Sequence, residues 1–533
     1  MKLPILGHNY IGGERSAQGN KQSVSLDART GEPYKVAFYV ATDAEIDAAV
    51  SAAEAAYPLY RKLSAAQRAD FLDAIAEELD ALGMDFVADV MRETALPSAR
   101  VLGERSRTSN QLRLFAKVLR RGDFYGARID VALPLRQPQP RPDVRQYKIG
   151  VGPVAIFGAS NFPLAFSVAG GDTASALAAG CPVVVKAHGG HLATSEWVAD
   201  AIERAVKKSG MPPGTFNMII GDHVGGRLVE ATGIKAVAFT GSLKGGRALF
   251  DLAAARPQPI PVFAEMSSIN PIILLPQALI HRGAAIAKEL TASVVMGCGQ
   301  LCTSPGLLLG VRSWEFSHFV DLLRAAMAAE APQSMLNRGI LANYQAGVAR
   351  LKQLPGIEVL VKGDEDADVS THQAAPHLFQ ANAALLFDPK KPLEEEVFGP
   401  ATVVVACDNQ QQLLRFAASM HGQLTATLIG EPGELPDYQE LIESLEEKCG
   451  RLLINGYPTG VEVSDAMVHG GPYPATSDAR GTSVGTAALD RFQRPVCYQN
   501  YPDALLPPAL QNANPLNILR LVEGVNTRTT IGE

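Results

Sequence analysis

Cys302 lies in a segment whose composition could present a reactive thiol to a small molecule. The segment reads GCGQLCTSPG over residues 297–306, with glycines before the cysteine and a Pro-Gly break after it. Glycine removes side-chain bulk from the backbone, so a substrate can approach the thiol closely. The thiolate is the nucleophilic form of cysteine, and it requires a lowered pKa or a neighbouring base. A buried structural cysteine is the alternative, and Cys302 alone does not decide between the two.

Two polar residues elsewhere have the chemistry that such a thiol needs. Glu265 directly follows the apolar segment PVFA, and a carboxylate at the end of a buried strand can act as a general base. Asn161 lies in the segment FGASNFP, where an amide near a helix N-terminus can stabilise a developing oxyanion. A surface glutamate in a salt bridge and an asparagine that caps a helix are the simpler alternatives.

Several other positions could bind a dinucleotide, although the usual Gly-x-Gly-x-x-Gly fingerprint is missing. The apolar segment VVVK ends at Lys186, and His188 follows; a basic strand end would attract a ribose 2′-phosphate, where an acidic one would hold the 2′-hydroxyl. Gly241 and Gly246 flank a turn in which backbone could approach a pyrophosphate at a helix N-terminus. Glu396 lies in the acidic run EEEVFGP, which by composition alone is a solvated patch. A solvent-exposed lysine and an ordinary glycine turn are the alternatives at the other sites.

Composition places these residues in a large folded protein. The chain has 533 residues, of which 47% are hydrophobic and 19% charged, so two or three domains are expected and a disordered chain is excluded. The net charge of −7 and the lack of a long basic run argue against a nucleic-acid partner. Six scattered cysteines indicate neither a disulfide framework nor a zinc site, so we expect a reducing, cytoplasmic setting and no metal.

Strand-like and helix-like segments alternate along two parts of the chain, which predicts α/β domains with parallel sheets. The first part is expected to contain strands 151–157, 183–186, 215–220, 236–239 and 261–264, with helices 162–179 and 194–209. The second starts at Asn270, so the two domains should meet near residues 265–270. Helices are also expected over residues 43–57, 65–82 and 97–120.

Two segments need a separate interpretation. Residues 134–142 contain four prolines, which exclude helix and central strand, so this stretch is an extended linker or an arm that reaches another subunit. Residues 151–171 carry no charge, but they contain Pro153, Pro163 and Asn161, so a buried strand, turn and helix fits better than a membrane span. No membrane partner is therefore expected.

Taken in order, six of these motifs resemble the aldehyde dehydrogenase superfamily. They are Asn-Phe-Pro after a strand, a strand ending in Lys, Phe-Thr-Gly-Ser, Glu265, Gly-Gln-x-Cys at Cys302 and Glu-x-Phe-Gly-Pro, with Glu265 located 37 residues before Cys302. The segments NGYPTGVEV and HGGPYPAT, which begin at Asn455 and His469, resemble a narrower branch. That branch contains dehydrogenases of α-ketoglutaric semialdehyde (2,5-dioxopentanoate) and NADP-preferring fatty aldehyde dehydrogenases.

The resemblance implies roles for individual residues. Cys302 would attack the aldehyde carbon, Asn161 and the Cys302 backbone N–H would stabilise the oxyanion, and Glu265 would activate the water that hydrolyses the thioester. On the cofactor side, Lys186 would bind the adenosine ribose region and Glu396 the nicotinamide ribose. Phe398 is expected beside the nicotinamide, and Gly241 and Ser242 are expected at the pyrophosphate.

The resemblance also implies an architecture. A Rossmann-type cofactor domain would comprise residues 1–130 and 149–264, and the catalytic domain residues 265–480. Residues 131–148 and 481–510 would form a small β arm for oligomerisation. A homodimer or a homotetramer is therefore expected.

Departures from the family pattern bear on cofactor and substrate. The residues after Glu265 are Met-Ser-Ser instead of Leu-Gly-Gly, and position 189 is Gly where NAD-preferring relatives often have Glu, so NADP is favoured, with NAD possible. A keto acid aldehyde requires a cation, and Arg107, on a helix face with Gly103 and Gln111, is the candidate for its carboxylate. Phe162 is expected to line the same site.

The sequence therefore predicts NADP-dependent oxidation of α-ketoglutaric semialdehyde to 2-oxoglutarate. A solvent-facing Arg107 and a medium- or long-chain aldehyde substrate are the alternatives within this family. A cysteine hydrolase that uses no nicotinamide, or a catalytically silent scaffold, are alternatives of another class.

Overall fold

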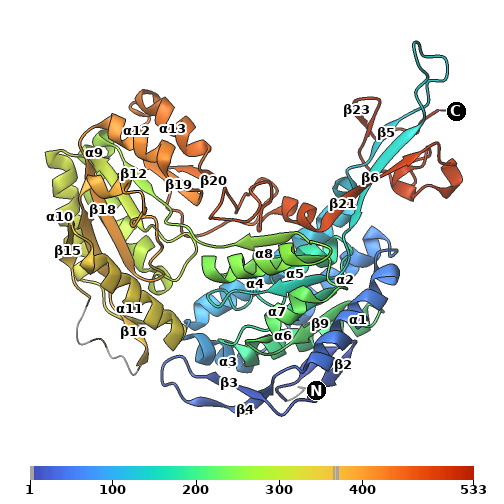
Figure 1. Ribbon diagram of the computed structural model, residues 1–533, viewed down its shortest axis with the longest axis horizontal. Coiled ribbons are helices and arrows are strands. Elements are labelled where there is room, and N and C mark those ends of the chain that lie inside the picture. The colour runs from blue at the N-terminus through green and yellow to red at the C-terminus, as the bar shows by residue number, and fades with distance from the viewer. Residues whose placement is uncertain (1–4, 364–366, 368–370, 533) are drawn as a thin grey trace.

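The computed structural model describes residues 5–363, 367 and 371–532 of the chain. Within them, two seven-stranded sheets form two lobes, and a five-stranded sheet extends from one of the lobes (Figure 1). Helices cover both seven-stranded sheets, so the predicted α/β fold is confirmed.

The first sheet is formed by the N-terminal half of the chain, in the strand order β11-β10-β7-β8-β9-β1-β2. Neighbours from β11 to β9 are parallel, whereas β1 and β2 are antiparallel. The central strands consist of buried, mainly apolar residues, as expected for a parallel sheet with helices on both faces. The bounds are β1 Asn9–Ile11, β2 Glu14–Ser16, β7 Val154–Phe157, β8 Val183–Lys186, β9 Phe216–Ile219, β10 Ala236–Thr240 and β11 Val262–Glu265.

Alternate residues of β7 point to opposite faces of this sheet. Val154 and Ile156 join a cluster with α2 to α6, whereas Ala155 and Phe157 join one with α1, α7 and α8. The helices are α1 Asp43–Tyr60, α2 Ala65–Asp80, α3 Met84–Thr94, α4 Ser98–Arg121, α5 Gly171–Ala178, α6 Leu192–Lys208, α7 Val224–Glu230 and α8 Leu243–Ala255.

The second sheet has the strand order β15-β17-β18-β13-β12-β19-β20. One face packs on α9 and α10, and the other on α11, α12 and α13. The strands are β12 Ile272–Leu274, β13 Leu307–Val311, β15 Ile357–Val361, β17 His377–Ala381, β18 Ala401–Cys407, β19 Gln423–Ile429 and β20 Cys449–Ile454. The helices are α9 Pro276–Val295, α10 Trp314–Ala328, α11 Arg338–Gln353, α12 Gln410–Ser419 and α13 Gln439–Glu446.

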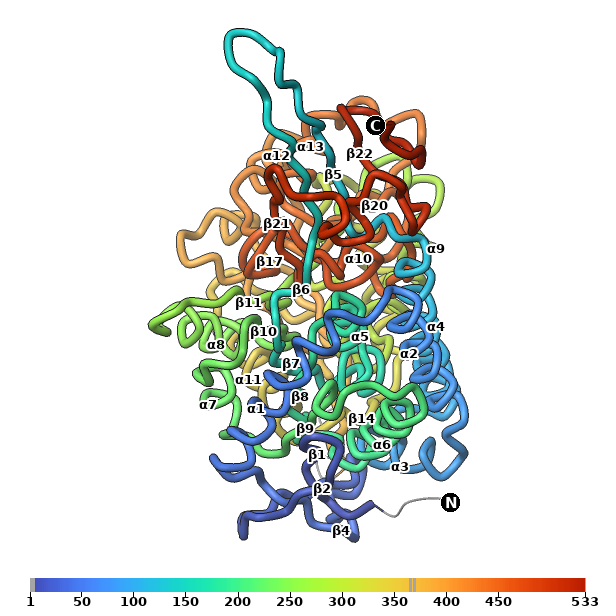
Figure 2. The backbone as a smooth tube through the Cα atoms, turned by 90° about the vertical axis from the view of Figure 1, so that its right-hand side faces the viewer, coloured from blue at the N-terminus to red at the C-terminus, as the bar shows by residue number. Residues whose placement is uncertain are grey.

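The third sheet forms the arm, in the order β21-β6-β5-β22-β23. Its strands are β5 Arg128–Asp130, β6 Val144–Gly150, β21 Gln493–Gln499, β22 Arg520–Val522 and β23 Val525–Thr527. β5, β22 and β23 lie outside the arm boundaries that the resemblance implied, because strand pairing extends the arm sheet beyond them. The proline-rich loop between β5 and β6 projects from the body, as Figure 2 shows, and Leu135 in it is 90% exposed.

One predicted helix is much shorter than expected. Residues 162–170 form turns, and α5 begins only at Gly171. The reason is a contact with α4: the Glu104 carboxylate accepts hydrogen bonds from the backbone N–H groups of Leu164 and Ala165 at 2.9 and 3.0 Å. This contact holds Phe162 and its neighbours in a loop that borders the candidate site.

Other predicted segments agree within a few residues, as α1, α2, α4 and α6 show. Short pairs of strands complete the fold: β3 Gln22–Leu26 with β4 Pro33–Tyr39, and β14 Gln333–Ser334 with β16 Gln373–Ala374. Among the described residues, no helix combines the length and the apolar character that crossing a bilayer demands.

Candidate active site

Cys302 follows a tight loop that begins with the 3₁₀ turn Met296–Gly299. Gly299 has φ +64°, and a Cβ on it would lie 2.3 Å from the carbonyl of Gly399, so only glycine fits here. Asn270, just before β12, donates from Nδ2 to the carbonyl oxygens of Cys302 and Ser304 at 2.9 and 3.0 Å. The loop is thus fixed on one side to the second sheet and on the other to the Phe-Gly-Pro turn.

His469 joins Cys302 to Glu265. Its Nε2 lies 3.3 Å from the Cys302 sulfur and 2.9 Å from Glu265 Oε1. The side chains of His469 and Glu265 are 0% and 3% exposed. Ser483 donates from its hydroxyl to the other oxygen, Glu265 Oε2, at 2.6 Å. Residues from the end of β11, the catalytic loop and the segment after β20 therefore meet at one point.

The surroundings of Glu265 and Cys302 change the pKa values of these two groups in opposite directions. Burial raises the pKa of Glu265, but the His469 ring and the hydrogen bonds from His469 and Ser483 outweigh it and hold that pKa below its ordinary value. Burial, followed by the Glu265 charge, raises the pKa of the Cys302 thiol well above its ordinary value. The sulfur is therefore protonated in this state, and the Glu265 carboxylate, with which the thiol forms a hydrogen bond, can take its proton.

Two potential oxyanion donors lie beside the sulfur. Asn161 donates from Nδ2 to the carbonyl oxygen of Gln300, two residues before Cys302, at 2.9 Å. A carboxamide has two N–H groups, so one donor is left for a ligand. The Cys302 backbone N–H makes no hydrogen bond within residues 5–363, 367 and 371–532. The structure thus brings together Cys302, Glu265 and Asn161 as the sequence predicted.

A cavity of about 340 Å³ opens in front of Cys302. Arg107 and Phe162 both line it, and the guanidinium of Arg107 lies over the rings of Phe162 and Phe166, at 5.6 and 5.3 Å from their centroids. Nε and Nη2 of Arg107 are buried without a hydrogen-bond partner in the described chain, and burial lowers the pKa of this side chain. Gln111, which shares the helix face of Arg107, lies against Gly171 instead of in the cavity.

Arg100 is a second cation on the cavity wall, but its charge is paired. Its Nη2 lies 3.2 Å from Glu104 Oε2, and its guanidinium covers Phe162 at 4.5 Å. Because Glu104 pairs with Arg100, Arg107 is the arginine on this wall whose charge is free to bind an anionic substrate.

The predicted adenosine side of the site is at the carboxyl end of β8. Lys186 Nζ lies 3.6 Å from Asp222 Oδ1, and a Cβ on Gly189 would lie 2.9 Å from the same oxygen. A carboxylate therefore lies beside Gly189 although the sequence has none at that position. His188 accepts a hydrogen bond at Nδ1 from the Gly190 N–H, and burial lowers its pKa far below the usual value. Burial thus favours the neutral form of His188, and the cofactor contact predicted for it stays a prediction.

The glycine turn after β10 has the geometry of a helix start. Ser242 caps α8 by accepting the Gly245 N–H at 3.2 Å, and Gly241 precedes it. Gly246 lies under Met266, since a Cβ on it would be 2.6 Å from Met266 Cγ. Gly246 therefore permits close packing of α8, and the cofactor contact predicted for it stays a prediction.

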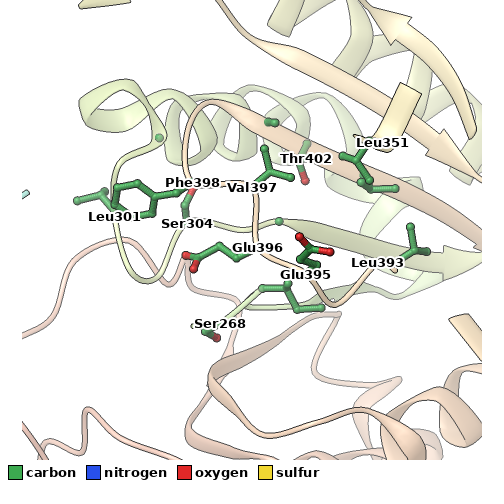
Figure 3. A pocket seen from close by; sticks show the side chains of 15 residues that line it. Ser268, Leu301, Ser304, Leu351, Leu393, Glu395, Glu396, Val397, Phe398 and Thr402 are labelled. Carbon is green, nitrogen blue, oxygen red and sulfur yellow. The ribbon is translucent and has the colours of Figure 1, made fainter. Parts of the chain in front are cut away.

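Glu396 and Phe398 lie on one loop before β18, as Figure 3 shows. The Glu396 carboxylate points to the side where Leu301 and Phe398 lie, whereas Glu395 lies nearer to Leu393 (Figure 3). Burial raises the pKa of Glu396 to about 8, and the charge of Glu265 adds to this effect. Both residues thus border the catalytic loop, as expected for contacts to a nicotinamide nucleoside.

His469, Ser483, Asp222 and Arg100 were not identified as site residues from the sequence. His469 does head the segment HGGPYPAT, so a signal for it was present. The ligand atoms of Glu265, Cys302 and His469 lie within 4.8 Å of one another, close enough to hold a metal ion. The expectation that no metal is needed stays a prediction.

Comparison with known proteins agrees with this geometry. Residues 16–492 match the model of the "Aldehyde dehydrogenase family". The chain is 54% identical to "Alpha-ketoglutaric semialdehyde dehydrogenase" of Acinetobacter baylyi, over 98% of this chain and 99% of that protein. It is 49% identical to "Alpha-ketoglutaric semialdehyde dehydrogenase 2" of Azospirillum brasilense, over 98% and 99% of the two chains. The crystal structure of Escherichia coli lactaldehyde dehydrogenase is similar with a TM-score of 0.79 at 22% identity, over 93% and 99%.

Proposed function

This chain belongs to the aldehyde dehydrogenase family and is an NAD(P)-dependent oxidoreductase, and we propose that it oxidises α-ketoglutaric semialdehyde to 2-oxoglutarate. The names of its two similar relatives support this substrate. The observation that carries the proposal is Arg107, an unpartnered guanidinium on the wall of the cavity that contains Cys302. A buried cation of this kind favours a substrate that brings its own carboxylate.

The first step is activation of the thiol. Cys302 gives its proton to the Glu265 carboxylate beside it, and His469 donates from Nε2 to the same carboxylate at 2.9 Å. The thiolate then attacks the aldehyde carbon, and the carbonyl oxygen becomes an oxyanion. The free N–H of Asn161 and the Cys302 backbone N–H stabilise it, and one such donor is worth about 3 kcal/mol.

The dinucleotide would be held by Lys186, Gly241, Ser242, Glu396 and Phe398. The N–H groups at the start of α8 that have no acceptor within the helix fit a pyrophosphate. The chemistry that a bound nicotinamide supplies is acceptance of the hydride from the tetrahedral adduct. We propose NADP as the preferred form, because Lys186 lies at the strand end, where a 2′-phosphate would replace the exposed Asp222 carboxylate as its partner.

The last step is hydrolysis of the acyl group on the Cys302 sulfur. Glu265 removes a proton from a water molecule, whose oxygen adds to the acyl carbon as the carbon–sulfur bond breaks. Ser483 keeps the carboxylate in position through its 2.6 Å hydrogen bond. Glu265 first releases to solvent the proton that it took from Cys302, so it can act as the base, and the proton that it then takes from water returns to the sulfur when the carbon–sulfur bond breaks.

Assembly and location complete the proposal. The projecting arm supports a homodimer or homotetramer, since a sheet that leaves the body of a subunit is suited to pairing with another one. A cytoplasmic location is proposed from the free cysteines.

Steady-state kinetics with NAD and NADP across a panel of aldehydes tests the function. The expected result is a kcat/KM for the keto acid aldehyde at least tenfold above that of aliphatic aldehydes of equal length. A preference for long aliphatic aldehydes, or turnover without dinucleotide reduction, would contradict the proposal.

A further inference from the structure

A second cavity, of about 420 Å³, lies where the N-terminus of α2 meets the arm. Its walls come from α2, the turn before β5, β6, the start of β21 and the C-terminal segment near residues 507–516. It shares no lining residue with the cavity at Cys302. The catalytic mechanism therefore makes no use of it.

Arg68 is the main reason to expect a ligand in this cavity. The residue is 4% exposed, yet its Nε is buried without a hydrogen-bond partner in the part of the chain that the structure describes. Its contact is the Phe124 ring, whose centroid lies 5.7 Å from Cζ. An unpaired buried guanidinium is costly, because it has lost its water without gaining an acceptor. An anion in the cavity would supply that acceptor.

The start of α2 adds to the positive potential at the same place. Ser64 and Gln67 form a capping box that satisfies the N–H of Gln67. The first two N–H groups of the helix, at Ala65 and Ala66, have no acceptor within the helix. Lys62 also lines the cavity, and no aspartate or glutamate does. All the charged residues that line this cavity are thus basic.

The cavity also offers a hydrogen-bond acceptor and aromatic rings. Oε1 of Gln493 is buried without a partner in the described residues. Phe124, Tyr125 and Tyr147 line the same cavity, with the centroids of Phe124 and Tyr125 4.1 Å apart and those of Tyr125 and Tyr147 6.1 Å apart. A ligand that satisfies these groups carries an anionic group for Arg68, a ring for the aromatic side chains and an N–H or O–H for Gln493.

We propose that this cavity is a binding site for a small aromatic carboxylate that bears a hydroxyl or amino donor. The carboxylate lies on Arg68 and the first N–H groups of α2, with Lys62 beside it. The ring lies against Tyr125 and Tyr147, and the donor reaches Gln493. A volume of about 420 Å³ lies within the range of small-molecule sites.

Calorimetric titration of the intact oligomer with 4-hydroxybenzoate tests this site. We expect one molecule bound per chain, with benzoate weaker because it lacks the donor and phenol weaker because it lacks the charge. Arg68→Gln should weaken 4-hydroxybenzoate at least tenfold, as expected for loss of a charged hydrogen bond. Lys62→Gln, at an exposed position that folding does not require, should weaken it by a smaller factor.

Arg107→Gln is the matched control, because the active-site cavity also contains an arginine that a carboxylate could reach. This variant should bind 4-hydroxybenzoate as tightly as the wild type does. The proposal is wrong if the wild type does not bind the probe, if Arg107→Gln abolishes binding, or if neither Lys62→Gln nor Gln493→Leu changes it. The Lys62 and Gln493 variants keep the test decisive if Arg68→Gln fails to fold.

Discussion

The aldehyde side and the dinucleotide side of the active site are built differently. On the aldehyde side, His469 Nε2 lies within 3.3 Å of both the half-buried Cys302 sulfur and the buried Glu265 carboxylate. On the dinucleotide side, Lys186 faces Asp222 across 3.6 Å, and the side chain of Asp222 is 70% exposed. Close contacts between buried groups fix protonation states, whereas a loose pair near solvent can rearrange around a ligand. Changes on the first side should therefore cost far more than changes on the second.

Replacement of the nucleophile should have the largest effect. Cys302→Ser changes a thiol into a hydroxyl that Glu265 cannot deprotonate to a useful extent, so kcat should fall about 10⁴-fold or more. The measurement is dinucleotide reduction at 340 nm with saturating substrate, with thermal unfolding as the control for folding. Retention of a tenth of the wild-type rate would show that the sulfur is not the reacting atom.

His469→Gln should come next, with a loss of about 10²- to 10³-fold in kcat. Because burial and Glu265 raise the pKa of Cys302, the wild-type rate should rise with pH as the thiol loses its proton. Without the imidazole, Glu265 loses the charge and the hydrogen bond that lower its pKa, so this rising limb should move to higher pH. A uniform loss at every pH would instead indicate a structural role. Ser483→Ala is the control, since it affects Glu265 without touching the sulfur.

Arg107→Met should affect binding of the keto acid aldehyde more than turnover. Loss of a charged hydrogen bond costs about 1.5–3 kcal/mol, so KM should rise about 10- to 100-fold. KM for an aliphatic aldehyde of equal length should not change. Arg100→Met should have a smaller effect, because Glu104 already pairs with Arg100. Equal effects of both variants on both substrates would show that neither arginine recognises the carboxylate.

Asp222→Asn should have the smallest effect, confined to the cofactor. Removing the carboxylate beside Lys186 takes away repulsion of a 2′-phosphate, so kcat/KM with NADP should rise about fivefold relative to NAD. Lys186→Met should change the same ratio in the opposite direction. An unchanged ratio in both variants would place the 2′-position away from this pair.

The sequence predicted the core of the site because residue type and local pattern are short-range properties. Apolar segments such as VVVK predict the buried strands of a parallel sheet. Because the carboxyl ends of such strands meet at one edge, Asn161, Gly241 and Glu265 are expected to lie there. The chain between 162 and 170 was expected to be helical, and its local pattern permits that. A contact with Glu104 of another helix decided otherwise.

Contacts across long separations could not be predicted in the same way. Asp222 and Gly189 are separated along the chain by a complete helix and strand, so the sequence predicted no carboxylate beside position 189. His188 looked like a cation, yet its Nδ1 accepts a backbone hydrogen bond and burial keeps it neutral. The residue type at each of these positions is known from the sequence, but the charges and the burial around its side chain are not.

The amino-acid sequence by itself determined the reactive groups of this protein and the strands and turns that carry them, since these depend on side-chain chemistry and near neighbours. Only the tertiary structure decided which nitrogen faces the Cys302 sulfur, which arginine is left without a carboxylate and which glutamate is held ionised. Those properties depend on distances and burial set by segments far apart in the chain, because electrostatic energy follows position in space and not order along the backbone.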